Sequence, residues 1–262
     1  MKLGVQIYGC TKEFRKDPEA FCARMAAAGY TQIEPCISLS MTAEELMVNG
    51  MNPVWQPEEV AGFQKMLQRH GLELTSCHIF GDVRKDADKA AALVEKHGVK
   101  QVVVNCGFAG TKVEYDAFAD GCLYLAQKLQ ALGAEMWIHN GWPEIRTKID
   151  GKTALEYVLE RCGGKVGTQI DTGWVQYGGE DPVVYLEKVA PYLRSIHHKD
   201  ICAGYETAGD NIHVAMGKGV VDWRGAKAVA DAKGLPEVID QDASRGDFIA
   251  DLEETAALIK NA

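Results

Sequence analysis

Residues 194–200 have the sequence Arg-Ser-Ile-His-His-Lys-Asp and follow an apolar segment, Val-Ala-Pro-Tyr-Leu, at residues 189–193. This order predicts a β-strand that leaves a hydrophobic core and ends in ionisable groups. Because side chains alternate between the two faces of a strand, we expect His197 and Lys199 on one face and His198 and Asp200 on the other. We interpret His197 as a metal ligand and Lys199 as its neighbour in the same cavity.

Seven other segments are short apolar runs of the same kind, and a segment with apolar residues at helical spacing follows each predicted strand. The predicted strands are residues 3–8, 31–37, 74–80, 101–106, 135–140, 166–172, 194–200 and 236–242. The predicted helices are residues 18–28, 58–70, 86–97, 114–132, 153–161, 182–190, 222–233 and 247–260. Glycine follows several of these helices, as is common at a helix end.

The alternation of strands and helices predicts parallel strand pairing. Eight such units in 262 residues predict an α/β fold, a single-domain (β/α)8 TIM barrel that spans residues 1–262. A doubly wound open sheet is the alternative, but nothing like Gly-x-Gly-x-x-Gly follows the first predicted strand. Residues 38–56 form a longer insertion, which either folds over the site as a lid or lies on the surface.

The chain is acidic, with a net charge of -9 and a pI of about 5.3. Proteins that bind nucleic acid need a basic face, and membrane-surface binders need a basic run or basic amphipathic helix, so we expect neither partner. The sequence begins without a signal-peptide pattern, and its eight cysteines stand singly, without a Cys-x-x-Cys pair. We therefore expect a cytoplasmic protein with reduced thiols. Whether it is a homo-oligomer stays open.

In a barrel of this kind the active site lies at the carboxyl ends of the strands. The last four predicted strands all deliver His, Asp or Glu residues to that rim. Carboxylates crowded there repel one another unless a cation or shared protons offset their charge. We therefore predict a divalent metal site with Glu144, Asp171, His197 and Asp240 as ligands. Such a set suits Mn²⁺, Mg²⁺, Co²⁺, Zn²⁺ or Fe²⁺, and mixed oxygen and nitrogen ligands without thiolate favour Mn²⁺.

Three of the predicted ligands, and Lys199 beside them, also have a purely structural interpretation. A histidine at a strand end is often a hydrogen-bonded core residue, which is the alternative for His197. Asp171 could cap the next helix, Glu144 could be a solvated loop charge, and Lys199 could simply pair with a nearby carboxylate. The joint pattern of these residues favours metal binding over the separate structural roles.

Three motifs resemble those of the xylose-isomerase-like TIM barrels, also called the sugar phosphate isomerase/epimerase family. His-Asn-Gly-Trp-Pro-Glu-Ile at residues 139–145 is similar to that family's His-Asn-His-x-x-Glu-Phe. Ile-Asp-Thr-Gly-Trp at residues 170–174 is similar to its Leu-Asp-Thr-Gly-Trp, and residues 197–200 match its His-x-Lys-Asp. Asp-Gln-Asp at residues 240–242 stands where the family usually has Glu-x-Asp, and residues 217–222 resemble a family Gly-x-Gly-x-x-Asp.

The resemblance implies that Glu144, Asp171, His197 and Asp240 hold a divalent metal, to which a keto-sugar or polyol binds through adjacent oxygens. Two residues depart from the family pattern. Gly141 replaces the second histidine of the motif at residues 139–145, which removes a substrate contact and widens the site. Asp240 is one methylene shorter than the glutamate expected there, so Asp242 is its rival as a ligand.

A metal bound to a carbonyl and a neighbouring hydroxyl acidifies the C–H between them by stabilising the enediolate. By resemblance to sugar epimerases, Glu144 is one base and Asp240 or Asp242 the other. Lys199 would polarise a substrate oxygen.

Five further residues are candidate substrate contacts. His139 would hydrogen-bond a hydroxyl group, and Trp142 and Trp174 would either stack on a sugar face or line the rim. Glu34 and His78 lie on predicted strands that point into the barrel, as substrate contacts or as a buried structural pair.

The function predicted first is a metal-dependent isomerase or epimerase that acts on a keto-sugar or polyol. The alternative is a metal-dependent lyase or dehydratase on a keto-sugar, keto-glycoside or inositol-like substrate, since loss of a β-substituent can follow the same proton removal. A DNA endonuclease shares the expected fold but carries more metal-binding histidines and a basic face. A non-catalytic sugar-binding or subunit role is the remaining interpretation.

Overall fold

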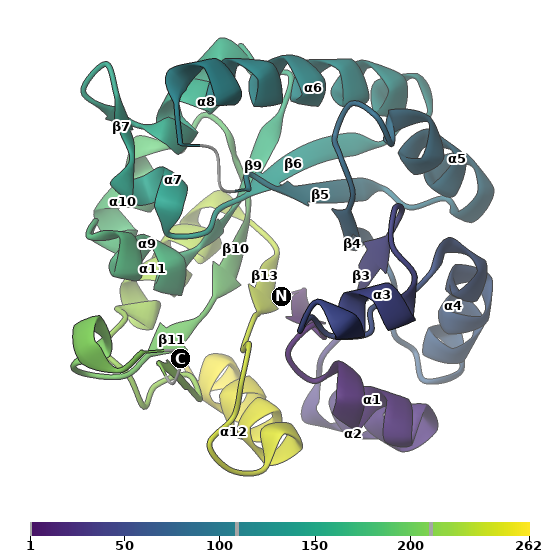
Figure 1. Cartoon of the computed structure of the whole chain (residues 1–262). Helices are drawn as coiled ribbons and strands as arrows, with labels where there is room; N and C mark the ends of the chain where they lie inside the picture. Colours follow the sequence, from purple (N-terminus) through teal and green to yellow (C-terminus); the bar gives the residue numbers. More distant parts are fainter. Residues whose placement is uncertain (1, 108–109, 210–211) are drawn as a thin grey trace.

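The computed structural model describes residues 2–107, 110–209 and 212–262. Nine strands form one parallel sheet in the order β2-β1-β13-β10-β9-β6-β5-β4-β3 (Figure 1). The strands are β1 (Leu3–Gln6), β2 (Gln32–Glu34), β3 (Cys36–Ser38), β4 (Ser76–Phe80), β5 (Gln101–Asn105), β6 (Glu135–His139), β9 (Gly167–Asp171), β10 (Leu193–His198) and β13 (Glu237–Ile239). The predicted TIM barrel is confirmed.

The predicted strand at residues 31–37 is divided in two by Pro35. Proline has no backbone N–H and cannot continue a hydrogen-bonded ladder, so β2 pairs with β1 on one side and β3 pairs with β4 on the other. The two outer strands of the sheet are thus consecutive pieces of chain. The covalent link through Pro35 closes the sheet into a barrel.

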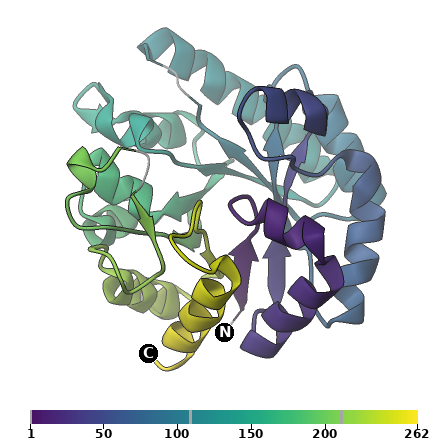
Figure 2. The same cartoon turned by 60° about the horizontal axis from the view of Figure 1, so that its bottom comes forward.

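Helices surround the sheet in the predicted positions (Figures 1 and 2). They are α2 (Pro18–Ala28), α4 (Val60–Arg69), α5 (Ala87–His97), α6 (Lys112–Ala131), α8 (Ala154–Arg161), α10 (Pro182–Lys188), α11 (Trp223–Lys233) and α12 (Phe248–Lys260). In Figure 2, α12 lies beside α2, where Arg24 forms an ion pair of 2.7 Å with Glu253. The last helix therefore packs against the first of the eight barrel helices.

Four short helices were not predicted from the sequence. They are α1 (Thr11–Lys16), α3 (Ala43–Val48), α7 (Pro143–Arg146) and α9 (Thr172–Gly178). The helix α3 lies within the insertion at residues 38–56 and begins with a capping box between Thr42 and Glu45. These helices are too short to show an amphipathic period, and α9 begins at the residue that follows the end of β9.

Two-stranded ribbons and 3-10 turns complete the connections. The ribbons are β7 (Lys148–Ile149) with β8 (Lys152–Thr153), and β11 (Asp200–Ile201) with β12 (His213–Val214). The turns are η1 (Pro57–Glu59) and η2 (Tyr205–Thr207). Among the described helices, none has the length and apolar character needed to cross a bilayer.

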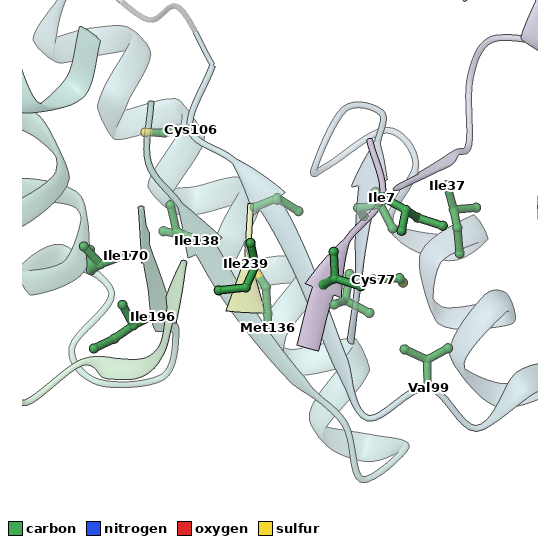
Figure 3. Packing of buried hydrophobic residues seen from close by; sticks show 14 of the residues in the cluster. Ile7, Ile37, Cys77, Val99, Cys106, Met136, Ile138, Ile170, Ile196 and Ile239 are labelled. Atoms are coloured by element: carbon green, nitrogen blue, oxygen red, sulfur yellow. The ribbon is translucent and has the colours of Figure 1, made fainter. Parts of the chain in front are cut away.

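Apolar side chains of the strands fill the layer between the barrel and its helices. Figure 3 shows several of them, including Ile138, Ile170, Ile196 and Ile239, all of which are buried. Ile196 and Ile170 are paired in register on neighbouring strands, so their side chains lie on the same face of the sheet. Seven of the eight cysteines are also buried thiols, as expected for a reduced protein.

The interior of the barrel is polar instead. Glu34 on β2 contacts His197 on β10 and Gln169 on β9, although neither strand neighbours β2. These contacts therefore cross the barrel interior. Because side chains alternate along each strand, the same strands supply an apolar outer face and a polar inner face. A barrel interior with buried ionisable groups departs from the usual packing of branched apolar residues and indicates a functional site.

Candidate metal and substrate site

A cavity of about 400 Å³ opens at the carboxyl ends of the strands. It is lined by Gln6, Tyr8, Cys36, Met51, His78, Phe80, Asn105, Gly107, His139, Asn140, Gly141, Trp142, Pro143, Glu144, Trp174, Lys199, Asp240 and Asp242. A larger cavity, of about 610 Å³, lies at the other end of the barrel, and none of its described lining residues is a predicted site residue. Most of the predicted site residues thus line the first cavity, whereas Asp171, His197 and Glu34 do not.

Four buried residues bring possible metal ligands together, and two of them, His139 and Asp240, line this cavity. The four are His139, Asp171, His197 and Asp240, whose ligand atoms all lie within 4.8 Å of one another. Nδ1 of His197 is 3.1 Å from both Nε2 of His139 and Oδ2 of Asp240. Nε2 of His139 is 3.6 Å from Oδ2 of Asp171. Three of the four predicted ligands are therefore close together, with His139 as the fourth member.

The donor atoms of this group fit a divalent cation. Among the described residues, Oδ1 of Asp240 is buried without a hydrogen-bond partner, and Oδ2 of Asp171 forms no hydrogen bond, although the Lys199 ammonium lies 3.0 Å from it. An unpaired buried polar atom is costly, and a cation bound to Oδ1 of Asp240 would satisfy that oxygen. Two imidazoles and two carboxylates are a ligand set that first-row divalent metals accept.

Glu144 lies outside this group. Its carboxylate is buried, and Oε1 accepts a hydrogen bond of 2.7 Å from the backbone N–H of Gly141. Burial raises the pKa of Glu144 to about 7, although that hydrogen bond lowers it. The side chain lines the cavity as an acid whose protonation changes near neutral pH. That suits proton transfer.

The position of His139 at the end of β6 is the signal that could have placed it in the metal group. Asp171 is likewise the last residue of β9, and the ends of parallel strands meet at one rim. Glu144 comes five residues after His139, on α7, beyond the strand end. Strand position therefore favours His139 as the fourth candidate ligand, whereas the type of side chain favours Glu144.

The ammonium group of Lys199 lies among three carboxylates. Its Nζ atom is 3.0 Å from Oδ2 of Asp171, 3.1 Å from Oδ2 of Asp240 and 2.5 Å from Oδ2 of Asp242. Burial alone would lower the pKa of Lys199, but these carboxylates raise it well above its usual value. The group is a fixed positive charge at the edge of the cavity, and it also lies 4.8 Å from the ring centre of Trp174.

Gly173 allows the Lys199 side chain to take this position. A Cβ atom at Gly173 would lie 2.7 Å from Cγ and 2.9 Å from Cβ of Lys199. These atoms are near the backbone and cannot move aside easily. The glycine after Asp171-Thr172 is therefore required by the close packing of α9 against the end of β10.

The protonation of the two central histidines differs. Burial and the neighbouring His197 keep the pKa of His139 well below its usual value. Burial would lower the pKa of His197 too, but Glu34 and Asp240 raise it to about 9. Asp240 is held as an anion, because Lys199 and His197 together outweigh its burial and bring its pKa well below the usual range.

Glu34 and His78 have different positions relative to the cavity. Both side chains are buried. His78 lines the cavity, whereas Glu34 does not. Oε1 of Glu34 is 2.8 Å from Nε2 of His197 and 3.1 Å from Nε2 of His78. The pair expected from the sequence is thus present, and it extends to the candidate metal ligand His197.

Aromatic side chains form much of the cavity wall. Trp142 and Trp174 line it as predicted, and Tyr8 and Phe80, which the sequence did not single out, contact each other edge to face with ring centres 5.7 Å apart. Asp242 also lines the cavity. An aromatic wall beside charged groups is common in sites that bind small polar rings.

The two remaining residues of the His-His-Lys-Asp stretch face away from the candidate metal group. Nε2 of His198 is 2.7 Å from Oε2 of Glu237, and both residues are buried. The Asp200 carboxylate accepts hydrogen bonds from the N–H groups of Gly217 and Gly219, both at 2.9 Å. The predicted alternation of faces along this strand is therefore present. Through these hydrogen bonds, Asp200 fixes the loop that contains Gly217 and Gly219.

The chain belongs to the xylose isomerase-like TIM barrel family, whose model matches residues 22–259. Members of this family include isomerases, epimerases and dehydratases. A crystal structure of a sugar phosphate isomerase/epimerase from Parabacteroides distasonis has a TM-score of 0.77 and 19% identity, covering 100% of this chain and 98% of that one. The Escherichia coli 3-keto-D-glucoside 4-epimerase has a TM-score of 0.67 and 13% identity, covering 100% of both chains. The TM-scores show that both proteins share the fold of this chain.

A curated relative is the inosose dehydratase of Bacillus anthracis. It is 28% identical over 92 residues, which is 35% of this chain and 30% of the relative. The matched part thus spans less than a third of that protein's length.

Proposed function

We propose that this protein is a divalent-metal-dependent isomerase or epimerase that removes a proton from a carbon next to the carbonyl of a keto-sugar or polyol-derived ketone. The observation that carries the proposal is one cavity whose lining includes two members of the candidate metal group, His139 and Asp240, together with Glu144 and Lys199. The family and its sugar-converting structural neighbours support the same class of reaction.

His139, Asp171, His197 and Asp240 would hold the cation, with Mn²⁺ as the first candidate and Mg²⁺, Co²⁺, Zn²⁺ and Fe²⁺ as others. When bound, such an ion polarises a carbonyl and an adjacent hydroxyl and so acidifies the C–H bond between them. The mixture of nitrogen and oxygen donors without thiolate supports a metal of this group. Glu144, which the sequence also placed among the ligands, is here proposed as a proton-transfer residue instead.

Glu144 would act as the general base. A base works best when its pKa lies near the working pH, and burial raises the pKa of this carboxyl to about 7. Oε1 accepts a hydrogen bond from the backbone N–H of Gly141, and within the described part of the chain no side chain of another residue is hydrogen-bonded to Oε2. The carboxyl is therefore oriented through one oxygen, leaving the other for the substrate proton.

Lys199 would stabilise negative charge that develops on the substrate oxygen. It is buried, positively charged and part of the cavity lining. Fixed charges in a water-poor site act strongly on a developing oxyanion. Asp242, next to Nζ of Lys199, would return the proton on the other side. Asp240, the other base that the sequence allowed, is here assigned to the cation instead.

The cavity supports a small substrate. Its volume of about 400 Å³ is at the lower end of the range for small-molecule sites. Trp142 and Trp174 would cover the apolar face of a sugar ring, and His78 and Asp242 would contact its hydroxyl groups.

A second candidate is a lyase or dehydratase acting on a keto-sugar, keto-glycoside or inositol-like ketone. The specific observation that favours it is the local similarity to inosose dehydratase. The same base, Glu144, would remove the proton, and Lys199 would assist the departing hydroxyl group. A non-catalytic sugar-binding role is the third interpretation.

The test is proton exchange in D₂O. Protein loaded with Mn²⁺ is incubated with a panel of ketohexoses, 3-keto-glycosides and inososes, and deuterium at the carbon next to the carbonyl is followed by NMR. We expect exchange that is lost in Glu144→Gln. An epimer identifies the first reaction, and an unsaturated product that absorbs in the ultraviolet identifies the second. Absence of metal binding and of exchange across the panel would leave the non-catalytic role.

A further inference from the structure

We propose that Glu34 is a positioning residue that holds the N–H of Nε2 of His197 and thereby turns Nδ1 toward the candidate metal group. This inference rests on the proposed function, because it assumes a cation at His139, Asp171, His197 and Asp240. It assigns Glu34 a role different from the substrate contact that the sequence allowed.

The two nitrogens of His197 have different partners. Nδ1 is 3.1 Å from Oδ2 of Asp240 and from Nε2 of His139, whereas Nε2 is 2.8 Å from Oε1 of Glu34. A neutral imidazole carries a proton on one nitrogen and a lone pair on the other, and the acceptor it meets decides which. Each nitrogen of His197 thus faces a carboxylate, Asp240 at Nδ1 and Glu34 at Nε2. A cation bound beside Asp240 would replace the proton on Nδ1, and Glu34 would keep the remaining proton on Nε2, which leaves the lone pair of Nδ1 for the cation.

Glu34 is itself fixed on all sides. Its Oε2 atom accepts hydrogen bonds from Oγ of Ser76 at 2.5 Å and from Nε2 of Gln169 at 3.0 Å. Its Oε1 atom faces the rings of His197 and His78. The acceptor positions of the carboxylate are thus occupied by protein donors. This arrangement favours a hydrogen-bonding role over a second cation shared by Glu34, His78 and His197, which also lie within ligand distance of one another.

The backbone of Glu34 is held equally firmly. Glu34 ends β2, and its carbonyl accepts a hydrogen bond of 3.1 Å from the N–H of Ile7. The carbonyl of Pro35 accepts one of 3.0 Å from the N–H of His78. Hydrogen bonds to neighbouring strands thus hold the backbone on both sides of the strand break. They fix the backbone position from which the Glu34 side chain points into the barrel.

The chain offers a matched control in the next histidine. Oε2 of Glu237 is 2.7 Å from Nε2 of His198, and both side chains are buried. This pair has the same chemistry as Glu34 with His197 but lies on the other face of β10. Glu237→Gln thus makes the same change in a buried Glu–His pair that does not face the candidate metal group.

The experiment measures Zn²⁺ and Mn²⁺ binding by calorimetry in the wild-type protein, Glu34→Gln and Glu237→Gln. Loss of an orienting carboxylate typically weakens metal binding about 10- to 100-fold. We expect that loss in Glu34→Gln and a change of less than about twofold in Glu237→Gln. Ser76→Ala keeps the carboxylate of Glu34 but removes one of its hydrogen-bond donors, so its metal affinity should lie between those of the two glutamine variants. It replaces Glu34→Gln in the experiment if that variant does not fold.

Nitrogen-15 NMR of the Zn²⁺-loaded wild-type protein provides the second readout. We expect the proton of His197 on Nε2. A proton on Nδ1, or unchanged affinity in Glu34→Gln beside tight wild-type binding, overturns this inference and leaves the proposed function intact. Two bound ions per chain, with both weakened in Glu34→Gln, would make Glu34 a ligand and also overturn it. A wild-type protein that binds neither metal removes the proposed metal chemistry, and this inference with it.

Discussion

Oε1 of Glu144 accepts a hydrogen bond of 2.7 Å from the backbone N–H of Gly141, while the side chain as a whole is 1% exposed. The backbone N–H groups of Gly141 and of Glu144 itself lower the pKa of this carboxyl, but they do not replace the water that a carboxylate loses on burial. The acid form is therefore favoured up to about pH 7 in the folded protein. This single residue links the stability of the protein to pH and prepares a proton acceptor in the cavity.

We predict that Glu144→Gln changes the pH dependence of stability in the metal-free protein. The folded pKa of Glu144 lies above its unfolded value, so its contribution to stability is fully present below about pH 4.5 and is lost as the pH rises to about 7. The loss corresponds to roughly 3 kcal/mol at most. Relative to the variant, the wild-type protein should lose stability over this interval, as measured by urea unfolding at several pH values. Parallel curves for the two proteins would contradict the raised pKa.

A second prediction separates the two possible ligand sets. His139→Ala should weaken divalent-metal binding by about 100-fold or more, since it removes a donor from the candidate metal group. Glu144→Gln should change it by less than about threefold, because its carboxyl lies outside that group. Calorimetry with Mn²⁺ and Zn²⁺ measures both. The reverse order of effects would restore Glu144 as the ligand and make His139 a substrate contact.

Substitution of Gly173 should disturb the site without touching an ionisable group. In Gly173→Ala the new Cβ would lie 2.7 Å from Cγ and 3.1 Å from the backbone oxygen of Lys199. Overpacking of this kind costs about 1–3 kcal/mol, and we expect lower exchange activity because the Lys199 ammonium is displaced. Thermal unfolding and the D₂O assay measure the two effects.

Gly62→Ala is the control for that experiment. Gly62 lies in α4, and among the described residues no heavy atom outside its own turn of helix lies within 4 Å of the point that a Cβ atom would occupy. Alanine in a helix is more stable than glycine by about 0.5–1 kcal/mol, so this variant should be slightly more stable and fully active. Equal stability and equal exchange activity of Gly173→Ala and Gly62→Ala would show that Gly173 is not under steric constraint.

Asp200→Asn should destabilise the protein while leaving metal affinity nearly unchanged. The carboxylate accepts hydrogen bonds from the N–H groups of Ile201, Gly217, Gly219 and Val221, and asparagine offers one acceptor oxygen in place of two. We expect a loss of about 2–3 kcal/mol in urea unfolding. Full stability together with lost metal binding would instead place Asp200 in the metal site.

The barrel could be predicted from the sequence because each strand–helix unit carries its own local pattern. The exception is the strand at residues 31–37, where apolar content suggested continuity but Pro35 removes a ladder donor and splits the strand. Short helices such as α9 were missed for a different reason. Seven residues do not complete two turns of an amphipathic period, and Asp171 serves both as its cap and as a candidate ligand.

The site was predicted less completely than the fold. Asp171, His197 and Asp240 meet as the strand-end argument requires, because parallel strands bring their ends to one rim. The fourth candidate ligand could not be decided from residue type. Glu144 is the better ligand for a hard metal ion, whereas His139 is the residue that lies at the end of a strand. Glu34 and His197, which form a hydrogen bond, are 163 positions apart in the sequence. No local sequence pattern can predict a contact at that separation.

Closure of the barrel at Pro35 has a consequence for how the protein is made. His197 lies between Glu34, from near the start of the chain, and Asp240, from its last barrel strand. During translation the emerging polypeptide can gather some of these groups early, but the set is complete only after the final β-strand docks onto β1. Shortened products that lack residues 236–262 should consequently be unable to retain an ion, and ion capture would report that β13 has docked.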